Sequence, residues 1–186
     1  MSLLLGDEFA RVMSAAQAGE DWAVARLYRS LQPALLRYLS ARQPLDAEDI
    51  AAQVWLEVAR ALTKFDGGED GFRAYVFTIT RRRMLNARRG RARRRADTVP
   101  MEALTGTIPA IDDPAAEAAA KIDSAAAVAG IVARLPAEQA DIVLLRVVAR
   151  LSVEEVATIV GKRAATVRVI QHRALRKLAS ELGEDA

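Results

Sequence analysis

The sequence predicts an all-α protein with two small helical domains, an N-terminal helical bundle and a C-terminal helix-turn-helix domain, joined by a flexible linker. Apolar residues recur every three or four positions, and no alternating apolar and polar run is long enough for a sheet. Hydrophobic residues make up 52% of the 186 positions, which is enough to build real cores. A proline-containing acidic segment separates two helical blocks, which predicts domains at 1–95 and 116–186 and a linker at 96–115.

Composition argues against several classes of chemistry. The chain has no cysteine, so disulfides, thiolate zinc sites and cysteine nucleophiles are excluded. Its one histidine, His172, has no metal-type partner nearby, and the sequence contains no phosphate-binding glycine loop. We therefore expect a protein that is not an enzyme, with no metal and no cofactor. No stretch resembles a signal peptide or a bilayer span, so a cytoplasmic location with no membrane contact is expected.

The first block begins with helices predicted at residues 9–18 and 22–40. In the second of these, four leucines form a stripe with the period of a helix: Leu27, Leu31, Leu35 and Leu39. Pro44 then interrupts the helical pattern. The stripe predicts the face of this helix that packs into the core of the first domain.

A third helix is predicted from residue 47 to about residue 64. Asp46 is placed as its N-cap, with Asp49 three residues later in the position that completes a capping box. Its predicted buried positions share a steady spacing: Ile50, Val54, Val58 and Leu62. Residues 66–71 contain three glycines and are predicted to form a loop, after which a fourth helix runs over residues 72–95.

The fourth helix carries the strongest charge signal in the chain. Residues 72–95 contain ten arginines and no acid, whereas residues 1–71 have a net charge of −4 and residues 96–120 have a net charge of −5. Arginines in such a run repel one another, so an external polyanion is expected to stabilise them. All nine aromatic residues precede Thr78, which favours the first domain for contact with unpaired bases. Core packing is nevertheless the favoured role for Phe72 and Tyr75, since they share a face with Val76 and Ile79.

The second domain contains the pattern of a helix-turn-helix. Pro136 is predicted at the first position of a helix that buries Ile142 and Leu145. Ser152 and Glu155 form a predicted capping box at the start of a short helix, and Gly161 ends that helix. A longer helix follows at about residues 164–182. Two helices joined by such a tight turn are typical of duplex DNA readers.

The last helix has one apolar face and one basic face. At about 100° per residue, Val167, Ile170, Ala174 and Leu178 fall on the apolar side. The opposite face and its flank carry the residues that could enter a major groove: Ala165, Arg168, Val169, His172, Arg173 and Arg176. Spacing alone fits a plain helical hairpin with a solvated basic face equally well.

Three stretches of the chain resemble bacterial sigma factors of the extracytoplasmic-function (ECF) type. Residues 46–55 resemble the helix that grips core RNA polymerase, residues 72–79 with the arginine run resemble the segment that melts and reads the minus-ten promoter element, and residues 135–178 resemble the reader of the minus-thirty-five element. The resemblance covers nearly the whole chain except the linker. It implies core RNA polymerase, promoter DNA and an anti-sigma factor as partners.

The resemblance also implies roles for individual residues. Core polymerase contacts are expected from Asp46, Glu48, Asp49, Gln53 and Trp55. Minus-ten contacts are expected from Arg82, Asn86, Arg89 and Arg93. Minus-thirty-five contacts are expected from Lys162, Arg163, Thr166, Arg168, Val169, His172 and Arg173. The loop at residues 67–71 corresponds to the pocket for a flipped base.

A helix-turn-helix regulator that binds DNA without polymerase remains the alternative. Such a protein is expected to be a dimer on a palindromic site, whereas the sigma factor is expected to be a monomer whose DNA binding depends on polymerase. Reversing the charge of Asp49 separates the two hypotheses, because only the sigma factor needs that helix to recruit polymerase.

Overall fold

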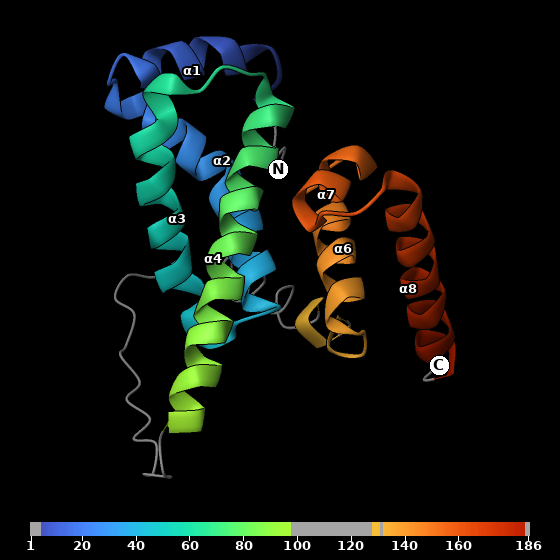
Figure 1. Ribbon diagram of the computed structural model, residues 1–186. Helices are drawn as coiled ribbons and strands as arrows, with labels where there is room; N and C mark the ends of the chain where they lie inside the picture. Colours follow the sequence, from blue (N-terminus) through green and yellow to red (C-terminus); the bar gives the residue numbers. More distant parts are fainter. Residues whose placement is uncertain (1–4, 98–127, 131, 185–186) are drawn as a thin grey trace, which may run out of the picture.

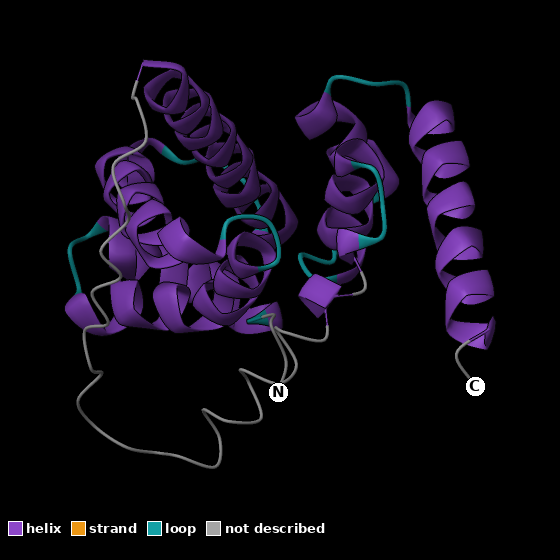
Figure 2. Cartoon of the chain, turned by 90° about the horizontal axis from the view of Figure 1, so that it is seen from below, coloured by secondary structure: helices purple, strands orange, loops and turns teal. Residues whose placement is uncertain are grey.

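The computed structural model describes residues 5–97, 128–130 and 132–184, and all regular structure in these ranges is helical (Figures 1 and 2). This confirms the predicted all-α class. The predicted linker, apart from Ala96 and Asp97 at the end of the fourth helix, and the predicted start of the second domain at residue 116 lie outside the described residues. Within the described ranges, no helix has the length and apolar character needed to cross a membrane.

The first domain is built from α1 (Phe9–Gln17), α2 (Asp21–Ser40), α3 (Ala47–Ala61) and α4 (Glu69–Asp97), with short 3-10 turns at Gly6–Glu8, Pro44–Asp46 and Leu62–Lys64. The four leucines of the predicted α2 stripe are all buried, as are the four apolar positions predicted for α3. Helix α3 packs against both α2 and α4, so the three longest helices of the domain share one core, and α1 lies across their upper end (Figure 1).

One local prediction in this domain is wrong, and a second holds only in part. The helix α4 begins at Glu69, three residues before the predicted start, because two acids at its first turn suit the positive end of the helix dipole. The Glu69 carboxylate is further held by the backbone N–H groups of Leu5 and Gly6. Asp46 occupies the predicted N-cap position of α3, but its side chain makes no capping hydrogen bond and instead forms an ion pair with Arg91 of α4.

The second domain contains α6 (Ala137–Val147), α7 (Val153–Val160) and α8 (Ala164–Glu184), preceded by helical residues at 128–130 and 132–133. Its core joins one buried side chain from each helix, among others: Leu145, Val156 and Val167. Pro136 occupies the N-cap position of α6 and not the predicted first helical position. The two domains touch where α7 packs against α4, on the side away from α3 (Figure 1).

Candidate nucleic-acid interface

The turn between α7 and α8 is built by local interactions. Ser152 and Glu155 form the predicted capping box, in which the Glu155 backbone N–H donates to Ser152 Oγ at 3.1 Å and the Ser152 N–H donates to Glu155 Oε2 at 2.6 Å. Gly161 ends α7 in the left-handed region with φ 69°. The Lys162 N–H then donates to the Ala157 carbonyl at 2.9 Å. These contacts set the angle at which α8 leaves α7.

The helix α8 has the two faces that the sequence predicts. Val167, Ala174 and Leu178 are buried against α6 and α7, and Ile170 is half-buried. On the opposite side, Thr166, Val169, His172 and Arg173 are exposed, and Val169 keeps 48% of its surface in solvent. An exposed valine at this position suits apolar contact with a thymine methyl group in a major groove.

Two cations at the start of α8 pair with exposed acids of their own domain. Lys162 Nζ lies 2.8 Å from Glu138, and Arg168 lies 2.6 Å from Glu154, with both members of the second pair more than half exposed. Arg163 is exposed as well. Surface ion pairs of this kind contribute at most about 1 kcal/mol. A phosphate or a guanine edge can therefore replace Glu138 and Glu154 at small cost.

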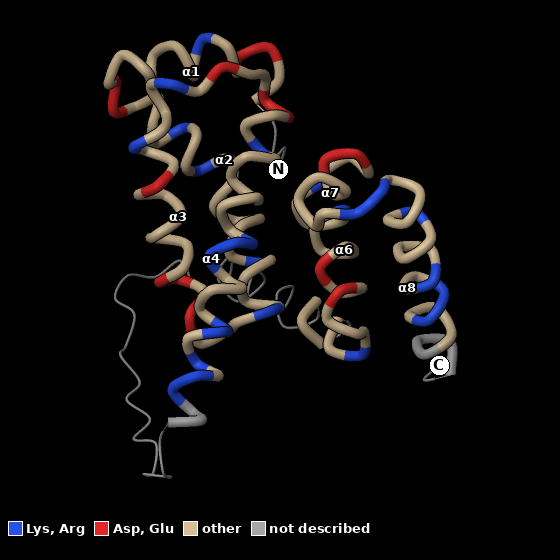
Figure 3. The backbone as a smooth tube through the Cα atoms, viewed as in Figure 1, with Lys and Arg blue, Asp and Glu red and all other residues tan. Residues whose placement is uncertain are grey.

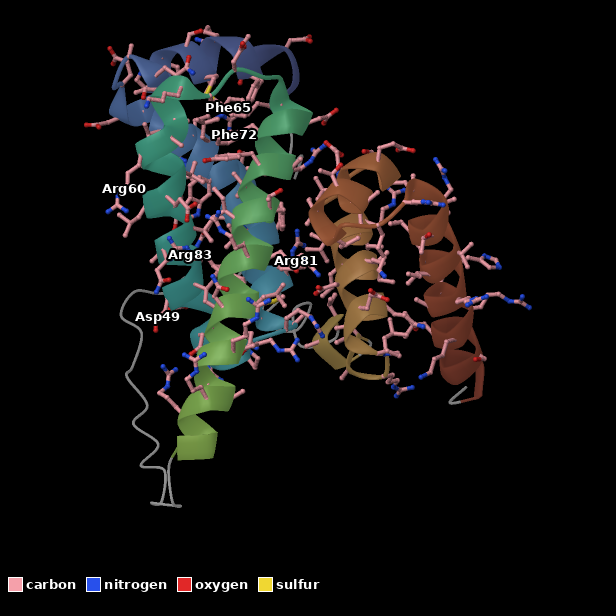
Figure 4. All side chains as sticks on the ribbon, viewed as in Figure 1. Asp49, Arg60, Phe65, Phe72, Arg81 and Arg83 are labelled. Carbon is pink, nitrogen blue, oxygen red and sulfur yellow. The ribbon has the colours of Figure 1, made fainter. Side chains whose placement is uncertain are left out.

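The arginines of α4 are not isolated from acids, contrary to the sequence prediction. Glu57 of α3 accepts hydrogen bonds from both Arg82 and Arg83, the latter at 2.8 Å, and Figure 4 shows Arg83 between α3 and α4. The hydrogen bond from Arg83, followed by that from Arg82, lowers the pKa of the Glu57 carboxyl below its ordinary value of 4.5. A contact between Arg82 and DNA therefore has to replace a charged partner within the protein.

The second half of α4 presents a basic surface. Asn86, Arg89 and Arg93 are exposed, and Figure 3 shows basic residues gathered along this half of α4 and along α8. The side chain of Arg91 is held toward the start of α3 by its ion pair with Asp46. The four predicted minus-ten residues thus divide into Arg82, which is engaged with Glu57, and three side chains that extend into solvent.

The aromatic residues of α4 belong mainly to the core, as predicted. Phe72 is buried and Tyr75 half-buried, and the ring of Phe65 packs against both, with centroid distances of 5.3 and 6.0 Å. Figure 4 shows Phe65 and Phe72 between the ends of α3 and α4. The predicted loop for a flipped base is shorter than expected, because residues 69–71 already form the first turn of α4. A Cβ atom on Gly67 would lie 2.9 Å from the Phe65 ring, so the remaining loop packs closely on that ring.

The exposed face of α3 carries the predicted polymerase contacts. Glu48, Asp49 and Gln53 are exposed, and Figure 4 shows Asp49 on the outer side of the helix. Trp55 is half-buried, its Nε1–H donates to Gln32 Oε1 at 2.6 Å, and its ring lies 5.0 Å from that of Tyr28. Asp46 is turned toward α4 by Arg91, so the structure separates it from the other four.

One apolar residue on this face was missed by the sequence analysis. Leu56 is 58% exposed and lies on the same side of α3 as Asp49, opposite the core positions. Beside it, Val24, Tyr28 and Trp55 line an open apolar groove of about 410 Å³. The signal was present in the sequence, since Leu56 falls outside the stripe formed by Ile50, Val54, Val58 and Leu62.

The structure presents three separate charged surfaces. These are a basic face on α8, a basic face on α4 and an acidic face with an apolar centre on α3. Among the described residues, no group of three or more histidines and acids is placed to hold a metal ion. His172 is exposed on the α8 face with Arg173, where it can contact DNA edges or phosphates.

Comparison with known families matches both domains. The Sigma-70 region 2 family matches residues 27–94, which include α3 and most of α4. The Sigma-70, region 4 family matches residues 126–178, which include α6, α7 and most of α8. The first match contains the acidic and arginine-rich surfaces, and the second contains the helix-turn-helix.

Solved structures and curated relatives extend the match to the whole chain. CnrH, solved in complex with the cytosolic domain of CnrY, has a TM-score of 0.64 at 20% identity and covers 97% of this chain and 100% of that chain. The sigma factor RpoE of Bartonella quintana, solved with the anti-sigma factor NepR, has a TM-score of 0.60 at 22% identity and covers 85% of this chain and 97% of that chain. At these identities the likeness is one of fold.

The curated relatives are more similar in sequence. The ECF RNA polymerase sigma factor SigD of Mycobacterium tuberculosis is 33% identical over 183 residues, which is 95% of this chain and 85% of SigD. The ECF RNA polymerase sigma factor ShbA of Streptomyces griseus is 33% identical over 172 residues, which is 88% of this chain and 89% of ShbA. Identity at this level across most of both chains shows that the protein belongs to the ECF family of RNA polymerase sigma factors.

Proposed function

We propose that this chain binds core RNA polymerase and directs it to promoters, where it contributes to promoter melting and to transcription initiation. The observation that carries the proposal is the presence, in one ECF-family chain, of basic reading faces on two separate domains together with an acidic face on α3. The chain supplies binding energy and no catalytic step, because nucleotidyl transfer belongs to the polymerase. This role places the protein in the cytoplasm.

The second domain is proposed to read the minus-thirty-five element as duplex DNA. Val169, His172 and Arg173 would face base edges from the middle of α8. Lys162, Arg163, Thr166 and Arg168 lie around the start of that helix, where phosphates pass on either side of the groove. Their exposure and their weak internal ion pairs support this division.

The first domain is proposed to hold the minus-ten element. Asn86, Arg89 and Arg93 would contact the DNA directly from α4, and Arg82 would do so after exchanging Glu57 for a phosphate or base. The exposed face of α3 would bind polymerase through Glu48, Asp49, Gln53 and Trp55, with Leu56 as the apolar centre of the contact. Asp46 would act through its ion pair with Arg91, by fixing the start of α3 against α4.

An anti-sigma factor is proposed as a further partner. The solved structure of RpoE with NepR shows that one fold relative is bound by such a protein. The apolar groove lined by Tyr28 and Trp55 lies beside the proposed polymerase face, so a protein bound there would compete with polymerase.

The test is transcription by bacterial core polymerase from a pool of templates with random upstream sequence, with and without the chain. Discrete new transcripts that share two spaced upstream motifs are expected. Asp49→Lys should abolish them and should also abolish co-elution with core polymerase, whereas the matched control Glu20→Lys, an exposed acid at the N-cap of α2, should leave both intact.

A second pair of variants tests the DNA contacts. Replacing Arg173 by alanine should weaken transcription by an amount equivalent to about 1–3 kcal/mol and relax specificity within the upstream motif. Arg29→Ala, which removes an exposed arginine from α2, is the matched control and should have no such effect. Unchanged DNA binding and transcription in Asp49→Lys would contradict polymerase recruitment through α3 and favour a regulator that acts without polymerase.

A further inference from the structure

The junction between the two domains is centred on a buried acid, Asp141 of α6. Its side chain is only 5% exposed, and among the described residues every hydrogen bond to its carboxylate comes from the first domain. Arg42 Nε donates to Oδ1 at 3.1 Å, Arg81 Nε donates to Oδ2 at 3.1 Å, and the Tyr38 hydroxyl donates to Oδ1 at 3.3 Å. Figure 4 shows Arg81 on the side of α4 that faces α6 and α7.

The same two arginines also hold the backbone of the second domain. Arg42 Nη2 donates to the Ala137 carbonyl at 3.1 Å, and Arg81 Nη1 donates to the Ile159 carbonyl at 3.3 Å. The arginine side chains are 12% and 22% exposed. Burial, and then the charge of Asp141, raises the pKa of the Tyr38 phenol well above its ordinary value of 10.0, so the hydroxyl remains a donor. Donors from two elements of one domain therefore converge on one carboxylate and two carbonyls of the other.

This network differs in kind from the other interactions of α6. The exposed Glu138, one turn earlier on the same helix, pairs with Lys162 of its own domain. Asp141 finds its partners only when the domains are docked, and removing one partner of a buried ionic group leaves an uncompensated charge. The network consequently contributes to domain docking and not to the folding of either domain.

The docked arrangement is too small to bind both promoter elements at once. Elements centred about 25 base pairs apart lie about 85 Å apart along B-form DNA. A compact chain of this length has a radius of gyration of about 16 Å, equivalent to a sphere about 40 Å across. The domains therefore have to separate before α4 and α8 can reach their two sites on straight DNA.

We propose that Asp141 is an autoinhibitory latch, which holds the two DNA-binding domains together in the free chain and has to be released before both promoter elements are bound. The biological role of this latch rests on the proposed function. Its physical basis is the Asp141 network itself, and this can be measured without DNA or polymerase.

The experiment measures the distance between the domains in the full chain by single-molecule energy transfer. Because the chain lacks cysteine, dyes can be attached at Ala10→Cys on α1 and Ala179→Cys on α8, both exposed positions. The labelled parent and the matched control Glu138→Gln should populate the high-transfer, docked state. Asp141→Asn keeps the shape of the side chain and should shift the ratio of docked to separated molecules by about 10²- to 10³-fold.

A second variant acts from the other side of the junction. Arg42→Gln should open the chain as Asp141→Asn does, and the double variant should open it little further, because both changes break the same contact. Circular dichroism should show unchanged helix content in each variant. A folded Asp141→Asn chain with the distance distribution of the parent would overturn the latch.

Transcription with core polymerase tests whether the latch is inhibitory. Asp141→Asn should match or exceed the parent at limiting polymerase, and it should bind a DNA carrying both elements more tightly than the parent in the absence of polymerase. Loss of transcription in a folded, open variant would overturn the inhibitory role. If the parent itself gives no transcripts, the proposed function fails, while the distance measurement still decides whether Asp141 holds the domains together.

Discussion

Gly161, at the turn between α7 and α8, offers a test of how the DNA-reading helix is positioned. Its φ of 69° lies in the left-handed region, and a Cβ atom added there would meet no atom within 4 Å. The change Gly161→Ala therefore adds no clash, and its cost is the backbone penalty alone, about 1–2 kcal/mol. Asparagine tolerates this region better than alanine does, so Gly161→Asn should cost less.

The effect should be confined to the second domain. Amide hydrogen exchange of α7 and α8, which open through unfolding of that domain, should become about 5–30-fold faster in Gly161→Ala. The melting temperature of a domain of this size should fall by about 4–16 °C. Gly68→Ala is the matched control, since its added Cβ also meets no atom within 4 Å and its φ is outside the left-handed region.

Equal exchange rates in the Gly161→Ala, Gly161→Asn and parent chains would refute this reasoning. Such a result would mean that the turn can leave the left-handed conformation without cost. A fall in stability for Gly161→Asn as large as that for Gly161→Ala would instead place the cost in the added side chain and not in the backbone.

Two further predictions follow from the pKa shifts. The folded-state pKa of Glu57 is lowered, so the stability difference between the parent chain and Glu57→Gln should be fully present above pH 4.5 and should disappear as the pH falls through the lowered value. Urea unfolding followed by the fluorescence of the two tryptophans measures this difference, and a difference that does not change with pH would contradict the prediction. The folded-state pKa of Tyr38 is raised, so its neutral phenol favours the folded chain below pH 10.0, and this preference is lost as the pH rises through the raised value. Comparison of tyrosinate absorbance with that of Tyr38→Phe should show this phenol ionising only as the chain unfolds, and ionisation in a still-folded chain would refute the burial argument.

The helix-turn-helix could be predicted almost completely from the sequence, because its determinants are local. Ser152 and Glu155 are three residues apart, and their reciprocal hydrogen bonds need only the first turn of α7. Gly161 ends that helix by its own conformational freedom. The exposed face of α8 followed from the helical period alone, since each position on a regular helix has a known direction.

The predictions failed where a residue had a choice of partner. Asp46 has the side chain of an N-cap, and the local pattern favoured that role, but Arg91 lies close enough in the folded chain to take the carboxylate. The start of α4 at Glu69 has a local cause in the two acids of its first turn and also a distant one, because the backbone N–H groups of Leu5 and Gly6 donate to the Glu69 carboxylate. These partners lie much farther away in the sequence than the few residues from which a helix end is predicted.

The sequence by itself determined the all-α class, the helix-turn-helix and the polarity of α3, α4 and α8, because periodicity and capping act over a few residues. Only the tertiary structure decided which acids neutralise the arginines of α4. Glu57 reaches Arg82 and Arg83 across 25 and 26 positions of the chain, and Asp141 reaches Arg81 across 60. Charges so far apart in the sequence meet only when helices pack. For Asp141, whose side chain is 5% exposed, burial then makes the pairing obligatory, because a buried charge without a partner is costly.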